Sequence, residues 1–505
     1  MSFNPRDPHN RTLLSQVHPP DWPTPTPANV YNLVVIGGGT AGLVTAGGAG
    51  MLGGKVALVE KHLLGGDCTN VGCVPSKTLI RAARAAHEVR QAHRFGVQVP
   101  PGMAVDFAAV MARVRQVRAE ISQNDAAARM RDEYGVDVFF GEAAFTGPNT
   151  IAVGDLTLRF KAAAIATGSS PVLPPIDGID SVEVLTNETV FNLTEQPQRL
   201  AVIGGGYIGC ELAQAFQRLG TAVTLLQRGD HLLKRAEPEV SALLQRQLTQ
   251  EGVDIRLNVD VTQVMQQGQE KQLHYHVAGE PGRLTADAVL VSAGRQPNVS
   301  GLGLAAVGVK ANEKGIAIND YLQTTNPNIY AVGDCAMAWK FTHAADAAAR
   351  IAVQNALFAP FGLGRRRLSD VVMPSCTYTD PEVAHVGITA AEAATRQDVR
   401  QLDVALGDVD RAITEGETAG FARIYLAQSS DRILGATVVA AQAGEMISEI
   451  TLAITQRLGL GAIAKVIHPY PTRAEVIRKV AETYSLAQFT PRIKRLAAEW
   501  LAWRR

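Results

Sequence analysis

One short pattern occurs twice in the chain and constrains its fold more than any other feature. An apolar run at residues 31–36 precedes a turn that contains Gly37, Gly39 and Gly42, and an apolar run at 200–203 precedes Gly204, Gly206 and Gly209. Each turn opens a stretch with helical character. A strand, a glycine turn and a helix in this order form the βαβ unit that holds a dinucleotide, because the glycines let the backbone approach a pyrophosphate at the helix N-terminus. The repeat predicts two nucleotide-binding domains in an α/β fold.

The two copies differ where their second strand ends. In the first copy the strand at 55–59 is followed by Glu60, whose carboxylate can accept hydrogen bonds from an adenosine ribose. In the second copy the strand at 222–226 is followed by Gln227 and Arg228, and Lys234 comes six residues after Arg228. An acid would repel a 2′-phosphate, whereas an arginine binds one. The second copy therefore predicts NADPH in preference to NADH, the alternative being that Arg228 is a solvated surface residue.

A cysteine pair follows the first glycine turn by about 30 residues, in the run from Gly65 to Lys77. Cys68 and Cys73 are framed by glycines there. A helix N-terminus lowers the pKa of a thiol, so we expect a Cys73 thiolate against an electron-poor cofactor ring and a Cys68 that meets substrate. Lys77, about one helical turn beyond Cys73, would place a cation near that ring. Two nucleotide domains and a dithiol predict a relay from NADPH to a flavin, then to the disulfide, then to substrate; two structural cysteines are the alternative.

The two ends of the chain look different from its body. Residues 1–30 are rich in proline, and we expect them to form no helix and to lie extended on the body, anchored by Trp22, with a partner-binding arm as the alternative. Residues 492–503 carry apolar side chains on one helix face. We expect that face to pack on the body or a partner subunit, and the alternative is a membrane surface.

The chain's composition excludes several classes of protein. Its 505 residues are 46% hydrophobic and 19% charged, which is typical of a globular protein of about three domains. Its 48 acidic and 48 basic residues give no overall charge that would favour nucleic acid or an anionic membrane. Five cysteines are too few for a disulfide scaffold, and we see no signal peptide or spanning segment, so we expect a cytoplasmic protein.

The last third predicts a domain of another kind. Residues 377–386, 420–426 and 432–439 read as strands, and residues 445–457 read as a helix. This order predicts an antiparallel sheet with helices on one face, an α+β domain.

Taken together, these motifs resemble those of the FAD-dependent pyridine nucleotide–disulfide oxidoreductases, the group of glutathione reductase, dihydrolipoamide dehydrogenase and mercuric reductase. The resemblance covers roughly residues 31–485. It rests on the cysteine run, on both glycine turns, and on three further segments, which are 166–168, 293–298 and 325–335.

The resemblance implies a fold and a domain order. The fold would be α/β, with two Rossmann-like domains for FAD and NADPH and a C-terminal α+β dimerisation domain. The domains would be an N-terminal arm at 1–30, an FAD domain at 31–170 and 298–370, an NAD(P)H domain at 171–297, and an interface domain at 371–505. The family is homodimeric, and its C-terminal domain completes the partner's active site.

The resemblance also implies roles for single residues. Cys73 would be the charge-transfer thiol and Cys68 the interchange thiol, and Glu211 would pair with Lys77 near the flavin. Asp334 would bind the FAD ribitol region. The cofactor-binding segments would also include Thr167, Gly168 and Gly294.

The chain departs from the family's disulfide reductases near its C-terminus. Those enzymes carry a histidine base that a glutamate orients, and alignment on Pro471 and Glu475 puts Tyr470 at the base position. A phenol with a pKa near 10 is a poor base at neutral pH, whereas a soft metal ion held by thiolates needs no such base. Mercuric reductases also have Pro-Tyr here. They typically end in a cysteine pair, however, and this chain has no cysteine after Cys376.

Three hypotheses follow for function. The first is a mercuric reductase-like enzyme in which Cys68 and Cys73 hold a substrate metal ion transiently. The second is a reductase of small disulfides, in which His468, two residues before Tyr470, serves as a displaced base; the favoured alternative for this histidine is a structural role. The third is a non-catalytic scaffold that retains FAD.

Overall fold

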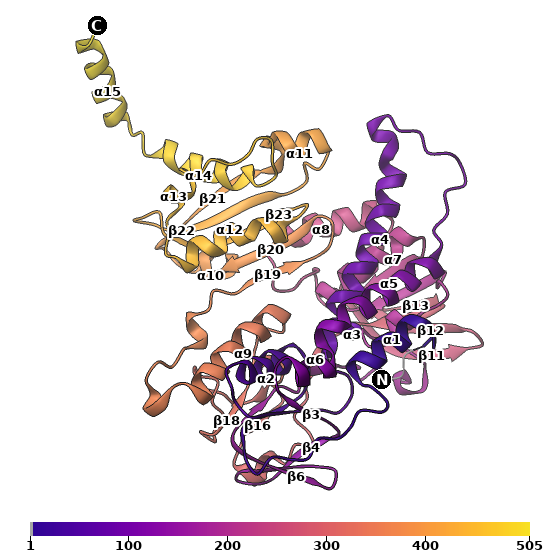
Figure 1. Ribbon diagram of the computed structural model, residues 1–505. Coiled ribbons are helices and arrows are strands. Elements are labelled where there is room, and N and C mark those ends of the chain that lie inside the picture. The colour runs from indigo at the N-terminus through magenta and orange to yellow at the C-terminus, as the bar shows by residue number, and fades with distance from the viewer. Residues whose placement is uncertain (1–3) are drawn as a thin grey trace. The chain divides into compact units, whose positions relative to one another are not determined.

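The first glycine turn lies at the carboxyl end of β1 (Tyr31–Ile36), an inner strand of a seven-stranded sheet. The structure, a computed structural model, describes residues 4–505 (Figure 1). Strands β3, β2, β1 and β6 lie in that order and are parallel, β18 pairs in parallel with β6, and β5 and β4 extend the sheet antiparallel. Their bounds are β2 (Val56–Glu60), β3 (Asp137–Phe140), β4 (Ala143–Gly147), β5 (Thr150–Val153), β6 (Leu156–Ile165) and β18 (Ile329–Ala331).

The second glycine turn lies in a smaller parallel sheet, of order β10-β9-β8-β14. Its strands are β8 (Arg199–Ile203), β9 (Ala222–Leu226), β10 (Asp254–Arg256) and β14 (Ala288–Val291). An antiparallel sheet joins β11 (Val259–Gln267), β12 (Glu270–Val277) and β13 (Glu280–Ala286). Two-stranded sheets pair β7 (Ser169–Pro171) with β15 (Arg295–Pro297) and β16 (Ala311–Asn312) with β17 (Gly315–Ile316). The two predicted βαβ units are therefore present, and the α/β fold class is confirmed.

Helices surround these sheets. Two of them follow the glycine turns, α2 (Thr40–Met51) and α7 (Tyr207–Leu219); the others are α3 (Gly66–Val71), α4 (Cys73–Gln91), α5 (Phe107–Ser122), α6 (Ala127–Asp132) and α9 (Thr342–Leu357). Short 3₁₀ turns are η1 (Ala92–Phe95), η2 (Gln123–Asp125), η3 (Ile179–Ser181), η4 (Val190–Asn192), η5 (Leu304–Val307), η6 (Gly333–Cys335), η7 (Pro360–Gly362), η8 (Leu368–Asp370) and η9 (Leu406–Asp408).

The N-terminal arm contains a helix that our sequence analysis did not predict. Helix α1 (Pro8–Val17) begins after Asp7, whose side chain accepts from the backbone of Asn10 at 2.8 Å. The expectation of no helix was wrong because the prolines gather at 19–27, while Pro8 occupies the first helical position, where no N–H is needed. Residues 18–30 of the arm form no helix or strand, and Trp22 anchors them by donating to the Val138 carbonyl at 3.0 Å. Residues 1–3 of the arm lie outside the described residues.

The chain divides into two compact units, and residues 231–250 group with 372–505 in the second. This unit contains a five-stranded antiparallel sheet of order β19-β20-β23-β22-β21. Its strands are β19 (Pro374–Thr377), β20 (Glu382–Gly387), β21 (Val399–Ala405), β22 (Phe421–Ala427) and β23 (Ile433–Ala440). We expected one strand over 377–386, but there are two, since the segment that contains Pro381 interrupts the ladder.

Helices cover one face of that sheet, as predicted. Ile447 and Ile450 of α12 (Ala443–Thr455) and Val476 of α14 (Glu475–Ala487) share a core with Ile424 and Val438 of the sheet. The opposite face receives Glu237, which accepts from the hydroxyls of Tyr425 at 2.9 Å and Thr437 at 2.7 Å. The unit's other helices are α8 (Pro238–Gln250), α10 (Ala390–Ala394), α11 (Asp410–Glu415) and α13 (Leu460–Ile463).

The last helix, α15 (Pro491–Trp503), has no buried residue. The expectation was packing on the body or on a partner subunit; the described residues of this chain do not cover the helix, and packing on a partner subunit stays a prediction. Among residues 4–505, no helix is long and apolar enough to cross a membrane.

Candidate functional site

The two cysteines lie on two short-linked helices that begin next to the first glycine turn. Cys68 is in α3 and Cys73 is the first residue of α4. Gly66, which opens α3, has a φ of +55°, and a Cβ there would lie 2.7 Å from the Cα of Gly39. Gly72 between the helices is equally constrained, because a Cβ would lie 2.8 Å from the Asp67 carbonyl. Glycine at these positions therefore lets the dithiol segment pack directly against the turn that faces a nucleotide.

Both thiols are free, and their environments set their pKa values apart. The hydrogen bond that Cys73 accepts from Cys68 lowers the Cys73 pKa to about 6; burial opposes this, and the Thr342 hydroxyl and the Lys77 charge add to the lowering. Donating that bond, together with burial and the neighbouring thiolate, raises the pKa of Cys68 above its ordinary value. The Thr342 hydroxyl at the start of α9 lies 3.3 Å from the Cys73 sulfur. The pair thus favours a Cys73 thiolate hydrogen-bonded by a Cys68 thiol.

An ion pair joins the dithiol helix to the second βαβ unit. The Lys77 ammonium in α4 lies 2.9 Å from the Glu211 carboxylate in α7, and the Glu211 side chain is only 4% exposed. Lys77 lowers the pKa of Cys73 through its charge, and Glu211 raises it. The arrangement can therefore hold a cation near Cys73 while neutralising most of that charge.

The first glycine turn is closely packed against the strand that follows it in the sheet and against a buried carboxylate. Gly37 has a φ of +103°, and a Cβ there would lie 2.4 Å from the Ala166 carbonyl oxygen. The buried Glu60 carboxylate accepts from the backbone N–H groups of Gly38 and His62, each at 2.6 Å. Burial raises the Glu60 pKa, and these hydrogen bonds counter the shift. A carboxylate accepts more than two hydrogen bonds, so Glu60 can also bind a ribose hydroxyl.

Arg295 connects the dithiol segment to Asp334 and was missed as a functional residue by the sequence analysis. Its guanidinium donates to Asp67, one residue before Cys68, and to the Ser169 hydroxyl at 2.8 Å, and that hydroxyl donates to Asp334 at 2.6 Å. Asn187 accepts from the same guanidinium at 3.2 Å. The signal available was an arginine in a segment that already resembled the family's, but its partners are 108 to 228 residues away in sequence.

Glycines next to Arg295 leave space for a ligand. Gly168 (φ +69°) and Gly294 (φ +144°) have no atom within 4 Å of the position that a Cβ would take. Thr167 faces the protein instead, since its hydroxyl donates to the Asn298 carbonyl at 2.6 Å. The open space beside Gly168 and Gly294 can therefore accommodate a cofactor, and the Thr167 hydroxyl fixes the turn.

The second glycine turn repeats the first in its backbone and differs at the residue that matters. A Cβ at Gly204 would lie 2.7 Å from the Ser292 carbonyl, and one at Gly209 would lie 1.9 Å from the Gly204 carbonyl, whereas Gly206 faces open space. Gln227 accepts from the Gly205 N–H at 2.9 Å, as Glu60 accepts from Gly38. The Gln227 amide therefore makes the hydrogen bond that Glu60 makes in the first copy, but it carries no negative charge.

The two cations expected at this turn lie on different parts of the chain. Arg228 is exposed, and within residues 4–505 its guanidinium donates to no protein group, so it is available to a phosphate. Lys234 is also exposed, but it falls in the segment 231–250 that groups with the second unit. Only Arg228 is thus placed with the second glycine turn.

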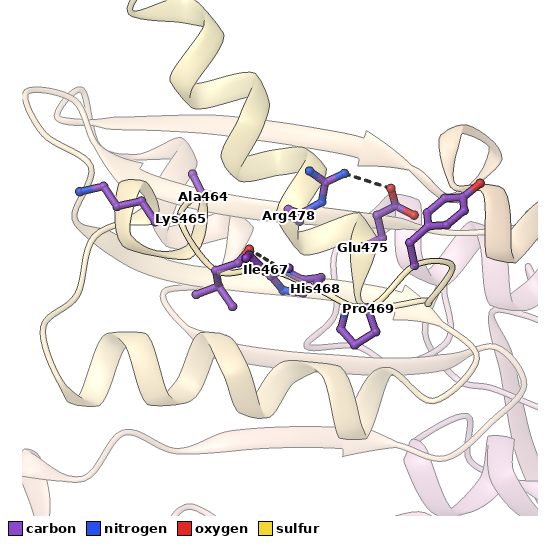
Figure 2. A pocket seen from close by; sticks show the side chains of 9 residues that line it. Ala464, Lys465, Ile467, His468, Pro469, Glu475 and Arg478 are labelled. Atoms are coloured by element: carbon purple, nitrogen blue, oxygen red, sulfur yellow. Dashed lines mark hydrogen bonds and ion pairs between the residues drawn. The ribbon is translucent and has the colours of Figure 1, made fainter.

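The C-terminal candidates gather around a cavity of about 250 Å³ in the second unit, lined by residues 464–470 with Glu475 and Arg478 (Figure 2). Tyr470 is 71% exposed, and its hydroxyl donates to Asp410 at 2.7 Å. That hydrogen bond and the Asp410 charge raise the pKa of Tyr470. Glu475 pairs with Arg478 at 3.1 Å, so in the structure neither carboxylate nor phenol orients the other as a base.

His468 does not share the hydrogen-bond partner of Tyr470, which is Asp410. Its Nε2 lies 3.0 Å from Glu449, its Nδ1 lies 3.2 Å from the Val466 carbonyl, and its side chain is 6% exposed. Both ring nitrogens therefore face acceptors, which favours a histidine that holds the loop.

Comparison with known proteins agrees with this geometry. A family model for pyridine nucleotide-disulphide oxidoreductases matches residues 31–349, and the model of that family's dimerisation domain matches residues 373–481. A mercuric reductase of Staphylococcus aureus is 37% identical over 456 residues, which is 90% of this chain and 82% of that protein. A dihydrolipoyl dehydrogenase of Bacillus subtilis is 35% identical and covers 89% of this chain and 95% of its own length.

A solved structure is similar over the same range. The HOCl-induced flavoprotein disulfide reductase RclA from Escherichia coli superposes with a TM-score of 0.79 at 27% identity, covering 90% of this chain and 99% of that one. Its complex with Cu(II) gives a TM-score of 0.80. The dimerisation domain indicates a homodimer. With its glycine turns, its dithiol and these matches, the chain belongs to the class I pyridine nucleotide–disulfide oxidoreductases, FAD-dependent enzymes that take electrons from NAD(P)H.

Proposed function

We propose that this enzyme uses NADPH to reduce a soft metal ion, with Hg²⁺ as the first candidate, through Cys68 and Cys73. The observation that carries the proposal is Tyr470 at the place of the family's base, with its hydroxyl committed to Asp410 and its pKa raised. The overall reaction takes the hydride of NADPH as two electrons and yields NADP⁺, Hg⁰ and a proton. This reaction has no leaving thiolate to protonate, so it does not need the histidine base that Tyr470 replaces.

The dithiol suits such a substrate. Thiolates are the ligands that soft metal ions prefer, and a thiol must lose its proton to bind one. Cys73, with a pKa of about 6, is a thiolate at neutral pH, and Cys68 supplies the second sulfur. Glu60 and the turn at Gly37 would hold the FAD nucleotide, and Asp334 and Arg295 would lie at its ribitol region. When bound, FAD supplies the two-electron chemistry that links NADPH to the dithiol.

Relatives support a metal substrate without identifying it. A mercuric reductase of Staphylococcus aureus is 37% identical, and one similar solved structure is a Cu(II) complex. Copper is therefore the second metal to test.

Arg228 and Gln227 support NADPH as the donor. The neutral Gln227 occupies the place of Glu60 without its charge, and Arg228 is an exposed arginine with no protein acceptor in the described part of the chain. A 2′-phosphate would give Arg228 a charge-assisted partner. Lys234, the second cation expected from the sequence, lies in the other unit, so the proposal rests on Arg228.

We propose that the homodimer completes each active site with the C-terminal domain of the other subunit. In that arrangement Tyr470 of the partner subunit would lie opposite Cys68 and offer a phenol as metal ligand or proton donor. Glu475 and His468 would shape the loop around it. A reducing compartment keeps such a dithiol usable, which favours the cytoplasm.

The second candidate is reduction of a small disulfide. It is favoured by the intact dithiol and by 35% identity to a dihydrolipoyl dehydrogenase. It requires His468 to release Glu449 or Val466 and act as the displaced base. If His468→Ala leaves turnover of a disulfide substrate unchanged, the histidine is not that base.

The cysteines provide the direct test. Cys68→Ser and Cys73→Ser should each abolish Hg²⁺-dependent NADPH oxidation in thiol buffer, while Cys376→Ser should leave it at the wild-type rate.

The third hypothesis, a scaffold that only retains FAD, is tested by two-electron reduction. An absorption band beyond the flavin peaks, lost in Cys73→Ser, contradicts that reading because the band needs the Cys73 thiolate.

A further inference from the structure

Helix α1 lies outside the matched family domain, which begins at residue 31, yet three side-chain contacts join it to α5. Asp7, which caps α1, lies 2.5 Å from the Arg115 guanidinium, and Asn10 accepts from Arg118 at 2.7 Å. The Ser122 hydroxyl donates to Gln16. These contacts recur at positions 115, 118 and 122, so they fall along one face of α5.

The same end of α5 also holds the helix that carries Cys68. Arg118 donates to the main-chain carbonyl of Asn70, two residues after Cys68, at 2.9 Å. Asp125, in the turn η2 that follows α5, accepts from the hydroxyl of Thr69 at 2.6 Å. Asn70 in turn holds the start of α3 in place, since its amide donates to the carbonyls of Leu64 at 2.9 Å and Gly66 at 2.8 Å.

Arg118 is the residue common to both sets of contacts. Its side chain is completely buried, and one guanidinium bonds Asn10 of α1 and Asn70 of α3. Burial, and the charge of the nearby Arg115, lower its pKa to about 10, and Asp7 opposes this. A buried guanidinium is tolerated only while its hydrogen bonds are made. Loss of the Asn10 acceptor would therefore drive Arg118 toward water and away from the Asn70 carbonyl.

We propose that the N-terminal helix is a positioning element of the active site, which acts through Asn10 and Arg118 to hold α3 and keep Cys68 in place beside Cys73. The proposal rests on the assignment of these two cysteines as the redox dithiol. Asp125 contributes to the same positioning, because it accepts from Thr69, the residue after Cys68. None of Asn10, Arg118 and Asp125 would need to touch substrate or cofactor.

The consequence is a change in the distance between the two thiols. Arg118 and Asp125 hold the residues that directly follow Cys68 in α3. If α3 shifts, Cys68 moves relative to Cys73, and the disulfide between them should close more slowly.

The test compares Asn10→Ala with Asn10→Asp in the FAD-bound, two-electron-reduced enzyme. The readouts are the rate at which the oxidant diamide closes the Cys68–Cys73 disulfide, followed by mass spectrometry, and the absorption band beyond the flavin peaks. Asn10→Ala should slow closure by about fivefold or more and weaken the band. Asn10→Asp should restore both, because a carboxylate accepts from Arg118 as the amide does.

Two control variants separate this effect from a general loss of stability. Thr12→Ala alters an exposed position of α1, and Leu13→Ala truncates a fully buried side chain of α1 but keeps Asn10. The proposal predicts wild-type closure rates for Thr12→Ala, and for Leu13→Ala at temperatures where it is folded. A wild-type closure rate and band in Asn10→Ala, or an equal change in Leu13→Ala at matched stability, would overturn it. If the wild type itself lacks the band and forms no Cys68–Cys73 disulfide, the dithiol assignment fails, and the proposal fails with it.

Discussion

Lys77 and Glu211 form an ion pair at 2.9 Å that joins the helix beginning at Cys73 to the helix following the second glycine turn. Glu211 belongs to the second copy of the repeated βαβ unit, whereas Lys77 lies on the dithiol helix α4, which follows the first copy. They act on the Cys73 thiol with opposite signs, since the lysine lowers its pKa and the glutamate raises it. The pair therefore links the dithiol to the second glycine turn.

This relationship predicts opposite shifts in two variants. The Cys73 pKa is depressed to about 6, so the thiolate is present above pH 6 and is lost as the pH falls through that value. Lys77→Met should move the midpoint upward and Glu211→Gln should move it downward, each by about one pH unit. The midpoint is measured from the long-wavelength absorption of the reduced enzyme against pH. Arg81→Met, which removes an exposed cation one turn further along α4, serves as the control. Shifts of the same sign in the two variants would contradict the account.

Tyr470 should discriminate between metal and disulfide substrates. Tyr470→Phe removes the hydroxyl and should lower kcat/KM for Hg²⁺ by about 3- to 10-fold. Tyr470→His restores the family's base and should raise turnover of a small disulfide by about tenfold or more. Asp410→Asn, which keeps the phenol but changes its partner, should alter Hg²⁺ turnover less than Tyr470→Phe. Disulfide turnover that is high in the wild type and falls in Tyr470→His would exclude the proposed role of the tyrosine.

Arg228 should set the choice of nicotinamide donor. Arg228→Glu places a negative charge where the 2′-phosphate is expected and should lower kcat/KM for NADPH by about 10- to 100-fold, with little change for NADH. Arg246→Glu makes the same change of charge at an exposed arginine of α8 and should leave both values unchanged. Equal losses with NADPH and NADH in Arg228→Glu would show that Arg228 does not read the 2′-phosphate.

Glu237 should be a main determinant of stability in the second unit. Its carboxylate is buried beneath Tyr425 and Thr437 and pairs with Arg423, so Glu237→Ala should destabilise folding by about 3 to 5 kcal/mol. Arg423 also pairs with Glu239, whose side chain is 58% exposed, and Glu239→Ala should cost less than about 1 kcal/mol. Chemical denaturation of the two variants measures the difference. Equal losses would mean that the buried contacts of Glu237 contribute no more than the surface pair.

The parts of the fold that depend on local pattern were predictable from the sequence. Strand β9 was predicted at its exact bounds, and the helix after each glycine turn was expected, because apolar periodicity and glycine turns act over a few residues. Helix α1 was missed because the prolines at 19–27 dominated the reading of the arm, although Asp7 and Pro8 form an ordinary helix start. The break at Pro381 was missed because one strand was predicted over 377–386 although that segment contains a proline.

The site was only partly predictable. The spacing of Cys68, Cys73 and Lys77 indicated a dithiol beside a cofactor, because those residues lie close together in the sequence. Arg118 carried no local signal, and the segment around Arg295 did not reveal its partners: each arginine bonds residues more than 40 positions away, and such partners are set by the tertiary fold. Long-range hydrogen bonds of buried arginines are the class of feature that the sequence alone did not reveal.

The measurement that tests the central claim most directly is NADPH consumption by the purified enzyme with Hg²⁺ in excess thiol, run beside a panel of small disulfides and Cu²⁺. The account predicts steady NADPH oxidation that depends on Hg²⁺, on Cys68 and on Cys73, with little turnover of any disulfide. Rapid turnover of a disulfide with no response to either metal ion would contradict it, and would mean that another group supplies the base that Tyr470 lacks.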